Sequence, residues 1–303
     1  MDKQEKHLLR HHLNMVGWGL FLYFIGYQIM TIVLLLIAVL VMPSRIYESE
    51  MTSTIITCVS VYIICPLVLW LFIRKIPSAK NDKRSLQFGQ MLNLVLCTIG
   101  ATYLFYYITL GLMELLKMGG IETADVVESA ISISIPFYII AFCIIAPIFE
   151  ELIFRKLLLE HLMPFGEIPA ICISAVAFGL FHMNLYQLFY TTVMGLIFAW
   201  VVMKTGKVRY SIILHAIANF TSYVVSLVSE ISDMWSIAMF ILTLLSILWA
   251  VCSFGFNARK KGLSFSESSL PAKWVLINLV TCPGIWACTL TGLLLGILTA
   301  LWA

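Results

Sequence analysis

The stretch VGWGLFLYFIGYQIMTIVLLLIAVLV, residues 16–41, contains no charged side chain. A helix needs roughly 20 consecutive apolar residues to cross the hydrocarbon core of a bilayer, so this stretch is long enough for a membrane span. It is too long for the apolar region of a signal peptide and lacks a clear small-residue cleavage site. We therefore expect it to be retained as the first of several transmembrane helices.

The composition extends this expectation to the whole chain. Of the 303 residues, 61% are hydrophobic and 12% are charged, whereas an ordinary soluble domain has roughly 25% charged residues. The net charge of +3 is small and gives no indication of a nucleic-acid partner. The eight cysteines are scattered through apolar stretches without a CxxC pair, which argues against a disulfide framework or a thiolate metal site.

Apolar runs separated by polar breaks predict an all-α, polytopic transmembrane helix bundle of about eight to nine spans. The expected spans are 16–42, 53–73, 88–116, 131–157, 168–184, 186–203, 210–228, 234–256 and 274–302. The weakest division separates the fifth span from the sixth, because no charged residue interrupts 168–203. We divide the chain into three N-terminal spans (1–130), a central set (131–228) and the C-terminal spans (229–303).

The distribution of basic residues tests this arrangement. With the N-terminus in the cytoplasm, every lysine and arginine except Arg45 and Lys117 falls on the inner side. Such asymmetry is what the positive-inside rule expects. The sequence thus predicts a multi-pass protein of the cell membrane, surrounded by membrane lipid, with a cytoplasmic N-terminus.

Three polar clusters lie in the predicted central spans, where ionisable groups are costly and usually functional. They are IAPIFEELIFRKLLLE (145–160), AFGLFHMN (177–184) and SIILHAIANF (211–220). Only two of the six histidines, His182 and His215, fall inside predicted spans, and each belongs to one of these clusters. This coincidence favours a functional site over isolated structural polar residues.

Helical spacing distinguishes the two glutamates of the first cluster, which we expect near the inner end of the fourth span. Glu151 and Arg155 are four residues apart, so they share a helix face and can form an ion pair. Glu150 points about 100° away from Glu151 and is less easily neutralised by its own helix. The structural alternative for the Glu151–Arg155 pair is an ordinary ion pair at the inner membrane interface.

The other two clusters repeat the spacing of four residues. Phe178 lies one turn before His182, and His215 lies one turn before Asn219. Each histidine, and Asn219, could alternatively serve as a helix–helix hydrogen-bond partner, as polar residues often do in membrane bundles.

Taken together, these groups suit the hydrolysis of a carbonyl compound. Glu150 would act as a general base, with His182 sharing that role or orienting the water. His215 and Asn219 would donate hydrogen bonds to the oxyanion. Glu150, His182 and His215 could instead bind zinc. Because HExxH and HxxEH are both lacking, we expect no cofactor, with zinc as the alternative.

At these residues the chain resembles the CAAX protease and bacteriocin-processing (CPBP or Abi) family of intramembrane endopeptidases. The resemblance covers roughly 132–228 and rests on three motifs in the family's order. They are EExxxR at Glu150, Glu151 and Arg155, FxxxH at Phe178 and His182, and HxxxN at His215 and Asn219.

The resemblance implies a membrane endopeptidase whose catalytic core is 131–228 and whose cavity is reached from the cytoplasmic side. By this resemblance Glu150 activates a water with help from His182, while His215 and Asn219 form the oxyanion hole. Glu151 and Arg155 support the site. The implied substrate is a peptide or protein, either prenylated or of the bacteriocin-precursor type. The family core resembles an eight-helix bundle.

Two other classes of function fit the same residues. A non-catalytic immunity or scaffold protein could bind a peptide or partner in the same cavity, since nothing in the sequence demonstrates turnover. A proton-coupled transporter could also use a buried carboxylate. We see no inverted repeat, which makes the transporter the weaker alternative.

Overall fold

The computed structural model describes residues 3–79, 83–121, 134–259 and 271–302, and within these ranges the chain is helical and contains no strand. The N-terminal part comprises α1 (Lys3–Val41), α2 (Ser44–Tyr47), α3 (Glu50–Cys58), the π-helical η1 (Val59–Ile64), α4 (Pro66–Ile73) and α5 (Phe88–Met118). The central part comprises α6 (Ile135–Tyr138), the π-helical η3 (Ile139–Ile145), α7 (Ala146–Glu151), the π-helical η4 (Leu152–Leu159), α8 (Glu160–Leu162), the short η5 (Met163–Phe165), α9 (Glu167–Phe181), α10 (Leu185–Thr205) and α11 (Val208–Ser229). The C-terminal part comprises α12 (Asp233–Arg259), α13 (Ala272–Thr281) and α14 (Pro283–Trp302).

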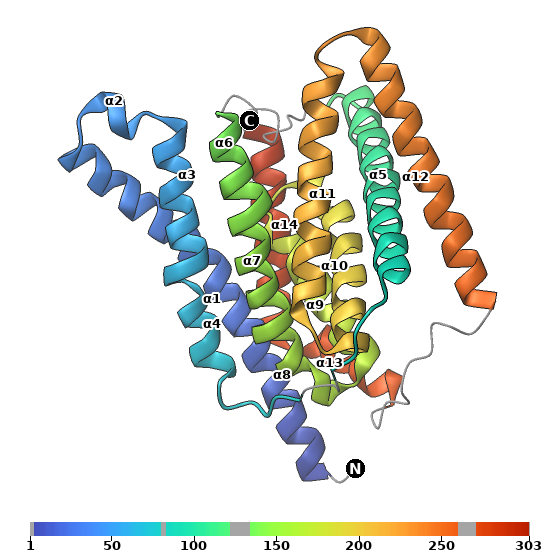
Figure 1. The fold of residues 1–303 in the computed structure, drawn as a ribbon. Coiled ribbons are helices and arrows are strands. Elements are labelled where there is room, and N and C mark those ends of the chain that lie inside the picture. The colour runs from blue at the N-terminus through green and yellow to red at the C-terminus, as the bar shows by residue number, and fades with distance from the viewer. Residues whose placement is uncertain (1–2, 80–82, 122–133, 260–270, 303) are drawn as a thin grey trace.

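Eight helical stretches in the described part of the chain are long and apolar enough to cross a membrane. The segment from α3 to α4 forms one of them, and the segment from α6 to η5 forms another (Figure 1). The polytopic all-α bundle predicted from the sequence is therefore confirmed. The predicted fourth span starts at 131, which lies outside the described residues. The predicted division at 130 and 228 stays a prediction.

The predicted spans at 168–184 and 274–302 are not single helices of membrane-spanning length in the structure. The span expected at 168–184 corresponds to α9, whose 15 residues extend about 22 Å, less than the roughly 30 Å of a hydrocarbon core. The span expected at 274–302 is broken between α13 and α14. The break follows from Pro283, which disfavours a helical conformation for the preceding residue, and Cys282 is indeed extended.

The outer surface of the bundle is apolar, as contact with lipid tails requires. On α12, for example, Ile237, Phe240, Leu244 and Leu248 are all exposed. Helix α1 packs along α4 and α14, and α5 packs along α10 and α12. Contacts between segments far apart in the sequence therefore close the bundle around the central helices.

The basic segments gather at one end of the bundle, where the N-terminus also lies (Figure 1). Several contacts tie that end together, among them the following three. The amide of Ala79 donates to the carbonyl of Glu160 over 3.0 Å, and the amide of Arg84 donates to the carbonyl of Thr205 over 2.8 Å. The third is an ion pair between Lys204 and Glu167. Lys80, Lys260 and Lys261 lie outside the described residues.

A proline shapes the helix that contains Tyr62. The amide of Cys65 donates to the carbonyl of Ser60, five residues earlier, which is the π-helical register. In that register the carbonyl of Val61 would pair with residue 66, but Pro66 has no N–H. The hydroxyl of Tyr23 on α1 donates to the Val61 carbonyl instead, over 3.2 Å.

The same arrangement recurs in the helix that contains Glu150. The amide of Ala146 donates to the carbonyl of Ala141, again five residues earlier. The carbonyl of Phe142 would then pair with Pro147, which has no N–H. The side-chain amide of Asn219 on α11 donates to it over 2.8 Å. Side chains of neighbouring helices thus satisfy the backbone groups that both prolines leave unpaired, as a membrane interior demands.

The turn after α9 holds His182 in place. Helices α9 and α10 approach closely at Gly179. A Cβ atom at this position would lie only 2.0 Å from the hydroxyl of Thr192. Met183 adopts a φ of 46°, which is uncommon for a residue other than glycine. The hydroxyl of Tyr27 lies 3.1 Å from the sulfur of Met183. Contacts from both α1 and α10 therefore stabilise the turn that carries His182.

Candidate active site

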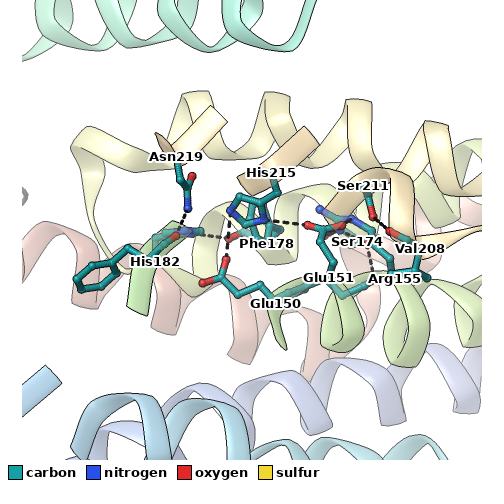
Figure 2. Close-up of polar contacts among 12 residues, drawn as sticks. Glu150, Glu151, Arg155, Ser174, Phe178, His182, Val208, Ser211, His215 and Asn219 are labelled. Atoms are coloured by element: carbon teal, nitrogen blue, oxygen red, sulfur yellow. Dashed lines mark hydrogen bonds and ion pairs between the residues drawn. The ribbon is translucent and has the colours of Figure 1, made fainter. Parts of the chain in front are cut away.

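The three predicted clusters meet inside the bundle, where α7 and η4, the end of α9 and the middle of α11 come together (Figure 2). Glu150 lies at the midpoint of the 31-residue stretch Ile135–Phe165. The helix continues beyond the predicted end at residue 157 to Phe165. The expected place of the glutamates near the inner end of a membrane span stays a prediction.

Glu151 and Arg155 form the predicted ion pair, with 3.1 Å between Oε2 and Nε, and both side chains are fully buried. The guanidinium also donates from Nη1 to the hydroxyl of Ser174 over 2.7 Å and lies 4.9 Å from the ring centroid of Phe178. The pair is thus buried inside the protein and is not a solvent-exposed ion pair. Removing one partner of a buried pair would leave an uncompensated charge.

His215 lies between the two glutamates. Its Nδ1 is 3.2 Å from Oε1 of Glu151, and its Nε2 is 3.8 Å from Oε2 of Glu150. Because a carboxylate accepts hydrogen bonds, Nδ1 is the nitrogen that carries a hydrogen. The imidazole stacks on Phe198 and meets the edge of Phe178. Glu151 and two aromatic rings therefore fix the orientation of His215.

Glu150 has two differently placed oxygens. Oε1 accepts a hydrogen bond of 2.6 Å from the hydroxyl of Tyr62. Oε2 is buried and makes no hydrogen bond within the described part of the chain. Buried polar atoms are almost always hydrogen-bonded to protein or water. Oε2 of Glu150 is thus the carboxylate oxygen that is available for a water or a ligand.

His182 follows directly after the last turn of α9. Its Nδ1 lies 2.8 Å from the carbonyl of Phe178, which can only accept, so Nδ1 carries the hydrogen. Nε2 is then an acceptor that can receive a hydrogen bond from a water. Among the residues it describes, the structure shows no hydrogen bond between His182 and Glu150.

Asn219 has a partner that the sequence did not predict. Its amide donates to the carbonyl of Phe142, which ties α11 to the helix of Glu150. One amide hydrogen is therefore engaged, and the second hydrogen and Oδ1 remain. The role of Asn219 in an oxyanion hole stays a prediction.

The zinc alternative would require Glu150, His182 and His215 to form a ligand cluster. Across the described ranges, no three histidine, cysteine, aspartate or glutamate side chains are grouped closely enough to hold a metal ion. This arrangement does not fit a three-ligand zinc centre, and the role of zinc stays a question for measurement.

Ser174 and Tyr62 are among the site residues that sequence reasoning missed. Ser174 lies one turn before Phe178 and two turns before His182, so its spacing gave a usable signal. Tyr62 belongs to no motif and lies in the second predicted span. The only hint in the sequence is a tyrosine deep within an apolar run, four residues before Pro66.

The apolar helices of membrane-spanning length define this chain as a multi-pass membrane protein. Its bundle encloses a polar site with a carboxylate, two imidazoles and a buried ion pair. Residues 132–221 match the family model described as "Type II CAAX prenyl endopeptidase Rce1-like". The chain is also 28% identical over 166 residues to "Putative membrane peptidase YdiL" of Bacillus subtilis (strain 168). No solved structure matches the chain.

The match to the Bacillus protein covers 52% of this chain and 66% of that protein, slightly less than two thirds of its length. The family match contains all three motifs, from Glu150 to Asn219. The resemblance to the CAAX protease and bacteriocin-processing family is therefore confirmed.

Proposed function

We propose that this chain is an intramembrane endopeptidase of the CAAX and bacteriocin-processing type, which hydrolyses peptide bonds with a water activated by Glu150. The observation that carries the proposal is the asymmetry of that carboxylate. Tyr62 binds Oε1, whereas Oε2 is buried without a hydrogen bond and faces His215. The family match and the Bacillus relative, whose name describes a membrane peptidase, support the same class of reaction.

In the proposed reaction, a water hydrogen-bonds to Oε2 of Glu150 and to Nε2 of His182. Glu150 accepts one proton as the water oxygen forms a bond with the carbonyl carbon of the substrate. The tetrahedral intermediate then loses its C–N bond, and the protonated Glu150 gives the proton to the departing amine. The products are a carboxylic acid and an amine, and Glu150 returns to its starting state.

His215 and Asn219 are the proposed donors to the oxyanion of the intermediate. In its doubly protonated form, His215 donates from Nδ1 to Glu151 and from Nε2 toward the site. Glu151, itself held by Arg155, compensates the charge of that ring. Asn219 would use the amide hydrogen that is not bound to Phe142.

The surroundings of the site support a proposal for the substrate class. Because Glu150 lies at the midpoint of a helical stretch that is long and apolar enough to span a membrane, the proposed substrate is one that can enter the bilayer. A prenylated peptide, or a precursor with an apolar leader, satisfies this requirement. We further propose that the chain lies in the cell membrane with its N-terminus in the cytoplasm, because the basic segments share one end of the bundle.

The proposal is tested by incubating the purified full chain with prenylated CAAX-type peptides and with leader-bearing precursor peptides in ¹⁸O-labelled water. We expect one peptide class to be cut and one ¹⁸O atom to enter the new carboxyl group. If a folded protein cuts neither class, and Glu150→Gln keeps the biological effect of the wild type, the chain is instead a non-catalytic immunity or scaffold protein.

A further inference from the structure

A hollow of about 190 Å³ lies between the helix of Tyr62 and the helix of Glu150. Thr57, Cys58 and Tyr62 line it from one side, and Phe142 lines it from the other. Tyr62 is the residue that connects this hollow to the site, because it lines the hollow and its hydroxyl binds Glu150. A molecule in the hollow would meet Tyr62 before it met the carboxylate.

Tyr62 is held at two points. Its hydroxyl donates to Oε1 of Glu150 over 2.6 Å, and its ring stacks on Phe149 with 5.6 Å between centroids and 21° between planes. A hydrogen bond to an ionised carboxylate is short and about twice as strong as one between neutral groups. With Oε1 fixed in this way, the other oxygen of Glu150 faces His215.

We propose that Tyr62 is a positioning residue for the catalytic base: it holds the carboxylate of Glu150 with Oε2 toward His215 and separates Oε1 from the hollow. This inference rests on the proposed function, in which Glu150 is the base. Tyr62 lies outside residues 132–221, the segment that matches the family model. The N-terminal spans therefore contribute a side chain to the geometry of the site.

The first test compares Tyr62→Phe with wild type on whichever peptide the full chain cuts. The variant keeps the ring that stacks on Phe149 and loses only the hydroxyl. We expect kcat to fall about tenfold while KM is unchanged, since the lost hydrogen bond acts on the base and not on the substrate. The matched control is Tyr107→Phe, which removes a hydrogen bond to the hydroxyl of Thr243 between α5 and α12 and should leave kcat at the wild-type value.

A second test does not depend on turnover. Dicyclohexylcarbodiimide, an apolar reagent, modifies protonated carboxyl groups inside membranes, and mass spectrometry locates the adduct. The Tyr62 hydroxyl occupies Oε1 of Glu150, so Tyr62→Phe, which frees that oxygen, should label at Glu150 about tenfold faster than wild type. Tyr107→Phe should label at the wild-type rate, and Glu150→Gln should show no adduct at residue 150.

The cleavage test and the labelling test separate the positioning role of Tyr62 from the proposed function of the chain. Equal labelling rates in Tyr62→Phe and wild type, or an unchanged kcat in Tyr62→Phe, overturn the positioning role. If wild type cuts no peptide, the proposed function fails, and the labelling rates alone decide whether Tyr62 controls Glu150.

Discussion

The side-chain amide of Asn219 donates a hydrogen bond to the backbone carbonyl of Phe142 over 2.8 Å. This carbonyl lacks a backbone donor because the residue five positions later is Pro147. Asn219 therefore has a structural task that can be measured apart from catalysis. It joins α11 to the helix of Glu150.

We expect Asn219→Ala to lower the free energy of unfolding by about 1–3 kcal/mol, because the Phe142 carbonyl loses its donor. Pro147→Ala restores a backbone N–H in the register that faces this carbonyl. The double variant Asn219→Ala/Pro147→Ala should therefore recover most of the lost stability. Unfolding of the four proteins in detergent, as a double-mutant cycle, measures the recovery.

The same cycle separates the two roles of Asn219. If Asn219 also donates to the oxyanion, kcat in the double variant stays roughly 100-fold below wild type although stability returns. If the effects of the two substitutions on the free energy of unfolding are strictly additive, Pro147 is not the reason that the Phe142 carbonyl requires a hydrogen bond from Asn219.

The buried ion pair between Glu151 and Arg155 leads to a second prediction. Arg155→Met should destabilise the protein by about 3–5 kcal/mol, because Glu151 is left charged in the core. The control is Lys156→Met, the neighbouring cation, which is half-exposed and pairs with Glu160. This exposed pair should contribute less than about 1 kcal/mol. Similar losses in both variants would contradict the burial of the pair.

Membrane orientation gives a third prediction. Arg45 and Lys75 are both exposed and lie at opposite ends of the segment Glu50–Ile73. In a background without native cysteines, Arg45→Cys should react with an impermeant maleimide on intact cells. Lys75→Cys should react only after permeabilisation. The cysteine-free background is the control, and the reverse pattern would place the N-terminus outside the cytoplasm.

A fourth prediction concerns metal. We expect elemental analysis of the purified chain to find no stoichiometric zinc, because Glu150, His182 and His215 do not form a ligand cluster. A content of about one zinc ion per chain, lost together with activity in His182→Ala, would contradict this expectation.

The sequence predicted those parts of the site that depend on local geometry. A spacing of four residues places Glu151 beside Arg155 in an α-helix and also in the π-helical form that the structure shows at 152–159. The ion pair was therefore predictable. The alternation of apolar runs and basic loops likewise predicted the bundle, because the bilayer imposes both.

Other features depend on packing between helices and were not predictable. The Tyr62–Glu150 hydrogen bond joins residues 88 positions apart. No sequence motif contains both of them, so the contact could not be predicted from spacing. The bond of Asn219 to Phe142 exists only because a π-helical register precedes Pro147. The end of the fourth predicted span was placed too early, because leucines after residue 157 continue the helix toward Phe165.

The most direct test of the account is the cleavage rate of Glu150→Gln beside that of Glu160→Gln. Glutamine keeps the shape of the side chain and an oxygen for Tyr62, but it cannot accept a proton from water. Glu160 lies on the same continuous helical stretch and pairs with Lys156. We predict that Glu150→Gln folds normally and cuts peptide at least about 100-fold more slowly than wild type, while Glu160→Gln cuts at the wild-type rate. A folded Glu150→Gln protein with wild-type kcat would contradict the account.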